Sequence, residues 1–250
     1  MIQETKKILS DLKWYGLLNT LDLRMTEATA HSWGHVEFLS ALVGDEKLYR
    51  EQQRTRKRLQ MAKFRQEATL EKVDYTLKRD LNRTQVQDLA QLQFLRPGTL
   101  KNVFLLGPTG VGKTFIATAL GHHACRQGFT TSFYGMHVLI EQLTLSRTDG
   151  SFLRLRDKLI KVDLLILDDV GLKVLPPQTV QDLYDILEER YQKKSTLVTT
   201  QLPLSNWKEI IEDPLILEAI LDRLVHPAIL LEIKGDSCRR KKGLEQSIKV

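Results

Sequence analysis

Eight consecutive residues have the types and spacing of a phosphate-binding loop. Positions 107–114 are Gly-Pro-Thr-Gly-Val-Gly-Lys-Thr, which matches the pattern G-x-x-x-x-G-K-T. Glycines allow backbone N–H groups to turn toward phosphate oxygens, and a helix that follows adds its positive N-terminal end. We expect the Lys113 ammonium to reach the outer phosphates and the Thr114 hydroxyl to bind Mg²⁺. The residues predicted to contact the nucleotide are Gly107, Pro108, Thr109, Gly110, Val111, Gly112, Lys113, Thr114 and Phe115.

The alternative for this stretch is a glycine-rich turn without a ligand. An apolar run at 102–106 precedes the loop, and a helical pattern at 115–127 follows it. A strand, a glycine loop and a helix in this order are the context that favours a nucleotide site over a simple turn.

Two adjacent carboxylates follow a second apolar run. Residues 162–167 are almost continuously apolar, as in a parallel strand buried on both faces, and Asp168 and Asp169 come directly after them. Open α/β sheets bind ligands at the carboxyl ends of their strands. We therefore expect Asp168 to share a Mg²⁺ ion with Thr114, and Asp169 to orient the attacking water as a base. A cap on the turn after the strand is the alternative role for this pair.

Two later positions would complete such a site. The polar residues 199–201 end another strand, where a side chain would lie near the γ-phosphate, although strand ends are often polar for other reasons. Arg223 lies near the end of a helix, and an arginine at a subunit edge can stabilise charge on a neighbour's nucleotide. Spacing alone favours a surface salt bridge from Arg223 to Asp222 or Glu218 instead.

The elements that must position these residues alternate between strand and helix from residue 102 onward. Such alternation predicts an α/β fold with a five-stranded parallel sheet, flanked by helices and joined by right-handed crossovers. The predicted strands are 102–106, 129–134, 162–167, 195–200 and 228–233. The predicted helices are 115–127, 138–145, 152–161, 176–190 and 214–224, with a short one around Trp207.

Residues 1–68 precede this pattern and predict a small all-helical N-terminal domain, so that the nucleotide-binding domain would be 69–250. An apolar helical face is expected at 8–17 and another at 33–48, and the latter continues into a charged helix. A further amphipathic helix is expected from Thr84 through Leu95. The candidate DNA-binding residues of the charged helix are Arg50, Arg54, Arg56, Lys57 and Arg58. A solvated helix face and a surface for the phosphate backbone of DNA are equally supported by this charge cluster.

The composition sets broad limits on partners and compartment. The 250 residues carry a net charge of +6, which weakly favours polyanionic partners. The two cysteines, Cys125 and Cys238, have no metal-ligand spacing, and this favours a reducing cytoplasm with Cys125 as a core thiol. No apolar run approaches the length of a membrane span, so we expect no membrane partner.

The combined motifs resemble a known family. The resemblance rests on G-P-T-G-V-G-K-T at 107–114, L-L-I-L-D-D at 164–169 and I-L-D-R-L-V-H-P at 220–227. Further matches are R-Y-x-x-x-S-T at 190–196, T-T-Q-L-P at 199–203 and G-D-S-C-R at 235–239. Together they resemble the IstB-type AAA+ ATPases, helper proteins of two-gene insertion-sequence transposition systems, which are similar to the DnaC helicase loader.

The resemblance assigns roles to individual positions of this sequence. It implies that Thr200 or Gln201 is the first sensor, and that Arg223 is an arginine finger supplied in trans between subunits. Asp169 stands where the family more often has glutamate, and the shorter side chain implies slow hydrolysis. Arg239 falls where a second sensor arginine might lie, or else belongs to the basic tail 239–242. The implied catalytic set is Lys113, Asp168, Asp169, Thr200 and Arg223.

For the whole protein, the resemblance implies an AAA+ P-loop NTPase that uses ATP and Mg²⁺. It would form a homo-oligomer on double-stranded DNA through ATP-bridged interfaces and assist a cognate transposase in target selection, with hydrolysis resetting the assembly. A helicase loader with the same ATPase is one alternative. A nucleotide-gated scaffold with negligible turnover is another, because Asp169 replaces the usual glutamate.

Overall fold

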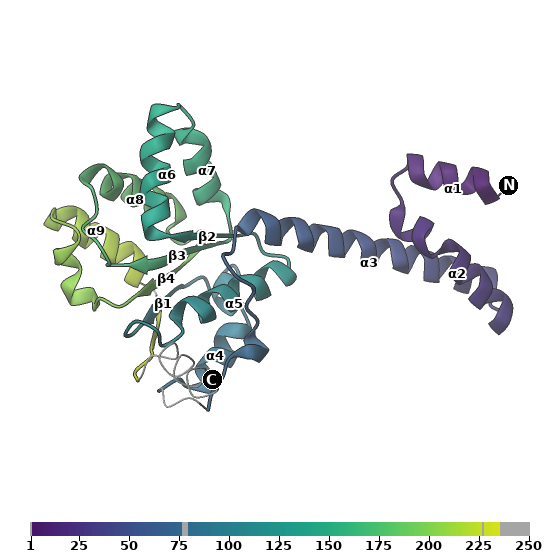
Figure 1. The fold of residues 1–250 in the computed structure, drawn as a ribbon, viewed down its shortest axis with the longest axis horizontal. Helices are drawn as coiled ribbons and strands as arrows, with labels where there is room; N and C mark the ends of the chain where they lie inside the picture. The colour runs from purple at the N-terminus through teal and green to yellow at the C-terminus, as the bar shows by residue number, and fades with distance from the viewer. Residues whose placement is uncertain (1, 77–79, 227, 236–250) are drawn as a thin grey trace, which may run out of the picture. The chain divides into compact units, whose positions relative to one another are not determined.

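The computed structural model describes residues 2–76, 80–226 and 228–235 (Figure 1). The chain separates into two compact units, residues 1–57 and 58–250, and the boundary falls inside the helix α3 (His35–Ala62). The segment 58–68, which the sequence pattern groups with the N-terminal domain, packs as part of the second unit.

The first unit consists of α1 (Ile2–Asp11), α2 (Tyr15–His31) and the first part of α3. Its core is small, and its buried apolar side chains are Leu9, Leu21 and Leu42. The apolar face expected at 8–17 is not one helix, because Lys13 has φ 58 and the chain turns between α1 and α2. Ile8 and Leu12, which belong to the expected face, are both 53% exposed.

A buried carboxylate holds α2 against α3. Glu46 accepts hydrogen bonds from the backbone N–H groups of Gly16 (2.7 Å) and Leu17 (3.2 Å), and from Nε of Arg50 (2.6 Å). It thereby satisfies donors in the first turn of α2, which have no partner within the helix. Burial raises the pKa of Glu46, but the hydrogen bonds from Arg50, Leu17 and Gly16 together hold it below its usual value. This contact therefore stabilises the unit at neutral pH and is lost as the pH falls through the lowered pKa.

The described part of the second unit contains a five-stranded sheet in the order β2-β3-β4-β1-β5. Every neighbouring pair of strands is parallel, which confirms the fold predicted from the alternation of strands and helices. The strands are β1 (Asn102–Leu106), β2 (Thr131–Gly135), β3 (Leu164–Val170), β4 (Ser195–Thr200) and β5 (Ala228–Glu232). Parallel pairing brings all the carboxyl ends to one edge of the sheet.

Helices cover both faces of the sheet, so apolar side chains of one strand enter two separate cores. Phe104 packs with α6–α9 on one face, while Leu105 packs with α4 and α5 on the other (Figure 1). The helices are α4 (Arg83–Ala90), α5 (Lys113–Arg126), α6 (Met136–Thr148), α7 (Phe152–Lys161), α8 (Pro177–Arg190) and α9 (Pro214–Val225). The expected helix through Leu95 stops at Ala90, because Leu92 adopts φ 54 before a 3₁₀ turn at Gln93–Leu95.

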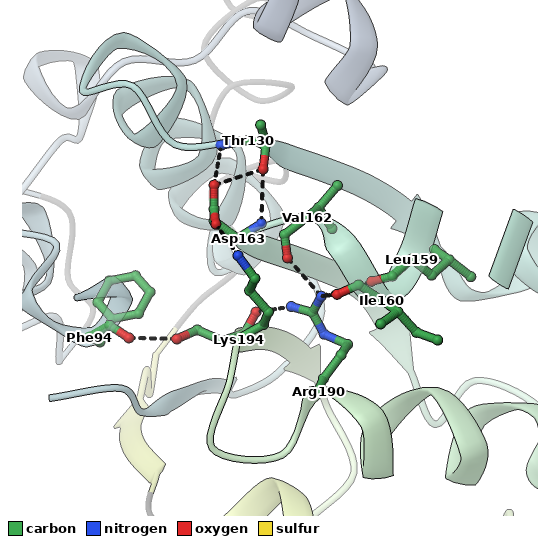
Figure 2. A network of polar contacts seen from close by, with 9 residues as sticks. Phe94, Thr130, Leu159, Ile160, Val162, Asp163, Arg190 and Lys194 are labelled. Atoms are coloured by element: carbon green, nitrogen blue, oxygen red, sulfur yellow. Dashed lines mark hydrogen bonds and ion pairs between the residues drawn. The ribbon is translucent and has the colours of Figure 1, made fainter. Parts of the chain in front are cut away.

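A buried arginine fixes the amino edge of the sheet (Figure 2). Arg190, at the end of α8, is 1% exposed, and its Nη1 donates to the carbonyls of Leu159 (2.7 Å), Ile160 (3.1 Å) and Val162 (2.8 Å). Its Nη2 donates to the carbonyl of Ser195, the first residue of β4. The guanidinium thus caps the last carbonyls of α7 and ties them to the start of β4.

Asp163 extends this network. Its carboxylate accepts from the backbone N–H (2.8 Å) and hydroxyl (2.7 Å) of Thr130 and pairs with Nζ of Lys194 at 2.5 Å (Figure 2). Arg190, Asp163, Lys194 and Thr130 are therefore bonded to neighbouring groups within the protein, and their role at this edge is structural.

We expect Gly16→Ala to destabilise the first unit. A Cβ at Gly16 would lie 2.5 Å from Cα of Glu46 and 2.7 Å from the carbonyl oxygen of Asp45, and neither backbone atom can move independently. A loss of about 1–3 kcal/mol is typical of such overpacking. Gly44→Ala is the matched control, because a Cβ there meets nothing within 4 Å. The control should be neutral or stabilising by about 0.5–1 kcal/mol.

Hydrogen exchange of the α2 amides measures this difference within the full chain. Gly16→Ala should lower protection across α2, and Gly44→Ala should preserve it. Equal protection in the two variants would contradict the close helix contact at Gly16.

Candidate functional site

The loop 107–114 joins β1 to α5 in a conformation that requires glycine. Gly107, Gly110 and Gly112 have φ values of 153°, 86° and 99°, which side chains rarely allow. A Cβ at Gly107 would also lie 2.2 Å from the carbonyl oxygen of Ile233, in the chain beyond β5. The loop thus passes close against neighbouring backbone and delivers the N-terminus of α5 to the carboxyl edge of the sheet.

Lys113 lies inside the loop. Its side chain is buried, and Nζ donates to the carbonyls of Gly107 (2.7 Å) and Pro108 (2.9 Å). An ammonium held by neutral carbonyls on the inner side of a phosphate-binding loop can exchange them for phosphate oxygens. The predicted phosphate role of Lys113 is compatible with this position.

Asp168 forms the centre of the site. Its carboxylate is 1% exposed, and Oδ1 accepts hydrogen bonds from the hydroxyls of Thr114 (2.9 Å) and Thr199 (2.6 Å). Its Oδ2 is buried and has no hydrogen-bond partner among the described residues. A buried carboxylate oxygen without a donor is expensive, and a cation at this point would satisfy it. The oxygen donors of Asp168 and Thr114 are the kind that Mg²⁺ prefers, so the residues fit this ion.

The electrostatics agree with this arrangement. Burial raises the pKa of Asp168 above its usual value; the Thr199 hydrogen bond opposes the rise, and the charge of Asp169 adds to it. The Thr114 hydrogen bond and the charge of Arg65 also lower the pKa of Asp168, but they do not cancel the rise. The carboxylate is thus destabilised in its charged form until a positive group approaches.

Asp169 lies where the regular strand is interrupted. Its φ is 59°, and the register between β3 and β4 is irregular from Leu167 to Val170. Its backbone N–H donates to the Thr199 hydroxyl at 2.9 Å. Positive φ is uncommon outside glycine and often accompanies functional positions. The structure thus places Asp169 beside Asp168, with its backbone fixed by the same threonine.

At the end of β4, the contacts separate three neighbouring polar residues. The Thr200 hydroxyl forms a local turn, in which it bonds the N–H (3.0 Å) and carbonyl (3.1 Å) of Leu202. Gln201, the other residue considered as a sensor, accepts a hydrogen bond from the Thr109 hydroxyl of the loop at 2.5 Å. Thr199 belongs to the polar strand end expected near the γ-phosphate but is not one of the two sensor candidates, and it is the threonine that contacts Asp168.

Arg223 lies away from its own loop. The side chain of Asn102, at the start of β1, donates to the carbonyls of Arg223 and Leu224 at 2.9 Å, whereas the loop follows the other end of that strand. The guanidinium pairs with Glu188 of α8 and lies 5.3 Å from the ring centre of Tyr184. The structure therefore does not bring Arg223 to the Asp168 site of the same chain.

Other predicted positions are placed as follows. Phe115 is half-buried in the first turn of α5, and Cys125 is buried in the same helix. Arg239 and Cys238 lie outside the described residues. Of the basic residues on α3, Arg50 pairs with Glu46, and Arg54, Arg56 and Lys57 are exposed. Among the described residues, no helix is long and apolar enough to cross a membrane.

The strand order, the glycine loop and the carboxylate at the end of β3 define a P-loop nucleotide-binding protein of the AAA+ class. Residues 7–246 match the family described as IstB-like ATP binding protein, and the chain belongs to this family.

Two relatives match over nearly the whole chain. A protein of Sinorhizobium fredii, named as an ATP-binding protein of an insertion sequence, is 39% identical over 227 residues, which cover 91% of this chain and 92% of the relative. A protein of Pseudomonas aeruginosa, named as an ATP-binding protein of insertion sequence IS21, is 32% identical over 241 residues, which cover 96% and 90%.

Solved structures support the fold. The crystal structure of DnaI aligns with a TM-score of 0.58 at 23% identity, over 67% of this chain and 91% of DnaI. The DnaC helicase loader aligns with a TM-score of 0.51 at 20% identity, over 60% of this chain and 87% of the loader. The similarity to insertion-sequence proteins and the structural similarity to DnaC, both expected from the sequence, are confirmed.

We expect Asp168→Asn to separate stability from metal binding. The folded protein holds the Asp168 proton more tightly than the unfolded chain does, because the pKa of Asp168 is raised on folding. The folded protein therefore loses stability as the pH rises from the usual pKa of this carboxyl through the raised one. At neutral pH the amide should leave the thermal midpoint of the nucleotide-free protein unchanged or higher. It should also abolish the Mg²⁺-dependent part of nucleotide binding, measured by calorimetry with and without Mg²⁺.

Asp163→Asn is the matched control. Burial raises the pKa of Asp163, but the hydrogen bonds from Lys194 and Thr130 outweigh it, so the pKa is lowered. This carboxylate stabilises the protein above its usual pKa, and its amide should therefore lower the thermal midpoint but preserve the effect of Mg²⁺. Undiminished Mg²⁺ dependence in Asp168→Asn would exclude Asp168 as the metal ligand.

Proposed function

We propose that this protein is an AAA+ ATPase that assembles on double-stranded DNA in its ATP-bound form and assists a transposase in target selection. Hydrolysis resets the assembly. The observation that carries the ATPase proposal is the contact of Asp168 with Thr114, beside a loop that holds Lys113. Kinship with proteins named for insertion sequences supports the transposition role.

The chain's own groups divide the chemistry among them. Lys113 and the N-terminus of α5 bind the phosphates, and Thr114 and Asp168 hold Mg²⁺. When bound, Mg²⁺ neutralises negative charge on the phosphates. Asp169 orients the attacking water, and its backbone is held for this task by the Thr199 hydroxyl. Gln201, bonded to Thr109 of the loop, is the better placed first sensor of the two residues considered.

Arg223 completes a neighbour's site. It lies at the amino end of β1, so its own nucleotide is out of its reach, but a second copy can present it across a subunit boundary. In the single chain, Glu188 and Tyr184 hold the guanidinium. Assembly then requires ATP, because the terminal phosphate of one subunit attracts the arginine of the next.

The exposed cations of α3 supply the DNA contact in this proposal. Within the described residues, none of Arg54, Arg56 and Lys57 forms an ion pair, so their charges are available to phosphates. Contacts of this kind depend on the backbone of DNA and carry little sequence information.

A helicase loader is the rival partner assignment. The relatives that cover most of this chain are named for insertion sequences, whereas the DnaC loader shares the fold at 20% identity. Binding to a purified transposase from the same mobile element, set against a replicative helicase, separates the two. Retention of the helicase alone would overturn the transposition role.

Lys113→Ala and Arg223→Ala should differ in one respect. Lys113→Ala should abolish ATP binding, and with it ATP-dependent assembly. Arg223→Ala should keep the affinity for ATP within about twofold, because the arginine acts on the nucleotide of the neighbour. It should lose assembly and hydrolysis, since loss of an arginine finger typically lowers the hydrolysis rate about 10³–10⁵-fold. Calorimetry measures binding, light scattering measures particle size, and phosphate release measures turnover.

The exposed Arg154 is the control for loss of a surface arginine, and Arg154→Ala should behave as the wild type. ATP-dependent particles of normal size in Arg223→Ala would refute the bridging role. Normal assembly with no phosphate release in the wild type would favour the nucleotide-gated scaffold.

Charge reversal at Arg54, Arg56 and Arg58 should weaken DNA binding. Each lost phosphate contact lowers the slope of log affinity against log salt by about one unit. Reversal at the exposed residues Lys173, Lys193 and Lys208 changes the net charge equally and should leave the slope intact. Titration of fluorescent duplex DNA at several salt concentrations gives the slopes, and equal slopes in the two triple variants would eliminate the α3 surface.

A further inference from the structure

Arg65 reaches the carboxyl edge of the sheet, although it belongs to the segment that follows α3. Its Nη2 lies 3.2 Å from Nε2 of His137. The guanidinium occupies the space over Gly135, where a Cβ would lie 2.3 Å from Nη2 and 3.0 Å from Cζ. Gly135 ends β2 and pairs in register with Asp168 of β3. The side chain thus lies beside the strand end that carries the central carboxylate.

The positive charge of Arg65 favours the ionised form of that carboxylate, and it therefore opposes the rise in the pKa of Asp168. Arg65 is exposed, and within the described residues its one hydrogen bond runs to His137. A guanidinium has five N–H donors in a planar fork, which suits phosphate oxygens. Most of these donors thus remain for a ligand at the edge of the sheet.

The same segment is anchored on the helix that begins at the glycine loop. Helix α3 ends before Lys63, which has φ 58. The centre of the Phe64 ring lies 4.2 Å from the centre of the His122 ring in α5. Gly121 provides the space, because a Cβ there would lie 2.7 Å from Cε1 of Phe64. Ala68 is fully buried. Segment 63–69 therefore contacts α5 through Phe64 and the end of β2 through Arg65.

We propose that Arg65 senses the terminal phosphate of ATP from within the same chain and transmits nucleotide occupancy to segment 63–69. The proposal rests on the ATP site proposed above and adds to it a cation that no loop or strand motif contains. The terminal phosphate would lie toward Asp168, within the field of Arg65, whereas ADP lacks this group. Arg65 would leave His137 to bind the terminal phosphate, while the Phe64 ring stays in place on α5. The backbone of segment 63–69 would then adjust to the new position of Arg65.

Three variants test the proposal. Arg65→Ala removes the cation. Gly135→Ala keeps the cation but displaces it from its place over β2; the added methyl meets the end of a flexible side chain, and φ at Gly135 is −67°, so the fold is preserved. Lys63→Ala is the matched control, because it removes one exposed positive charge from the same segment.

The measurements are the affinities for ADP and for a nonhydrolysable ATP analogue, by calorimetry, and hydrogen exchange of segment 63–69 with each nucleotide. Arg65→Ala and Gly135→Ala should each weaken binding of the analogue about tenfold, as expected for the loss of a charged hydrogen bond, with ADP affinity within about twofold. The analogue should protect the segment more than ADP does in the wild type and in Lys63→Ala, but not in the other two variants.

If the ratio of the analogue affinity to the ADP affinity is the same in Arg65→Ala as in the wild type, the sensing role is overturned. Failure of the underlying ATP site has a different signature, because the wild type would then bind neither nucleotide and would match Lys113→Ala. Loss of analogue binding in Arg65→Ala without any nucleotide-dependent protection in the wild type would overturn the transmission to segment 63–69.

Discussion

The buried carboxylate of Asp168 is the group on which the nucleotide site depends. One of its oxygens accepts from hydroxyls on two elements, Thr114 of α5 and Thr199 of β4, while the other lacks a partner among the described residues. A half-satisfied buried charge is destabilising, so the surrounding fold must hold it in place. Parallel pairing does this, because the apolar runs of β3 and β4 are buried on both faces and stay in register from Leu164 to Leu167, directly before Asp168. The free energy of the two cores thereby maintains a site that favours a cation.

The two edges of the sheet divide structural and functional roles. At the amino edge, Arg190 and Asp163 satisfy nearby carbonyls and N–H groups within the protein. At the carboxyl edge, Asp168 and Lys113 are held by contacts that a nucleotide and its metal can replace. Polar groups bonded to one another rigidify a fold, whereas replaceable contacts mark where a ligand enters. Arg223 follows the same division, because its carbonyl accepts from Asn102 at the amino end of β1 and its guanidinium pairs with Glu188 within the protein.

The sequence predicts the sheet well because its strands are buried on both faces and therefore appear as apolar runs; β1 and β4 have the predicted bounds. The same burial conceals side-chain direction. Leu197 and Thr199 point to the α5 face with Ile166 and Asp168, and this parity decides that Thr199 meets the carboxylate while Thr200 does not. The sequence of β4 has no alternation of polar and apolar residues that would show which face each side chain points to.

In the first unit, the break at Lys13 is equally hidden, because one residue with positive φ divides an otherwise continuous helical pattern. Arg65 belongs to no motif, and its place beside β2 depends on how segment 63–69 packs.

The geometry at Asp169 affects the expectation that an aspartate here, where the resemblance implies a glutamate, slows hydrolysis. In a regular strand, two adjacent side chains point to opposite faces, so only one carboxylate of the pair could serve the site. The φ of 59° at Asp169 breaks this alternation, and the hydrogen bond from its N–H to Thr199 helps to offset the strain. A residue in this conformation costs of order 1–3 kcal/mol unless its surroundings enforce it. The reach of the second carboxylate therefore depends on backbone direction as well as on side-chain length. An aspartate is one methylene shorter than a glutamate, and this changes the length of the side chain. The direction in which the carboxylate leaves the backbone is set separately, by the turn that the Thr199 hydroxyl holds.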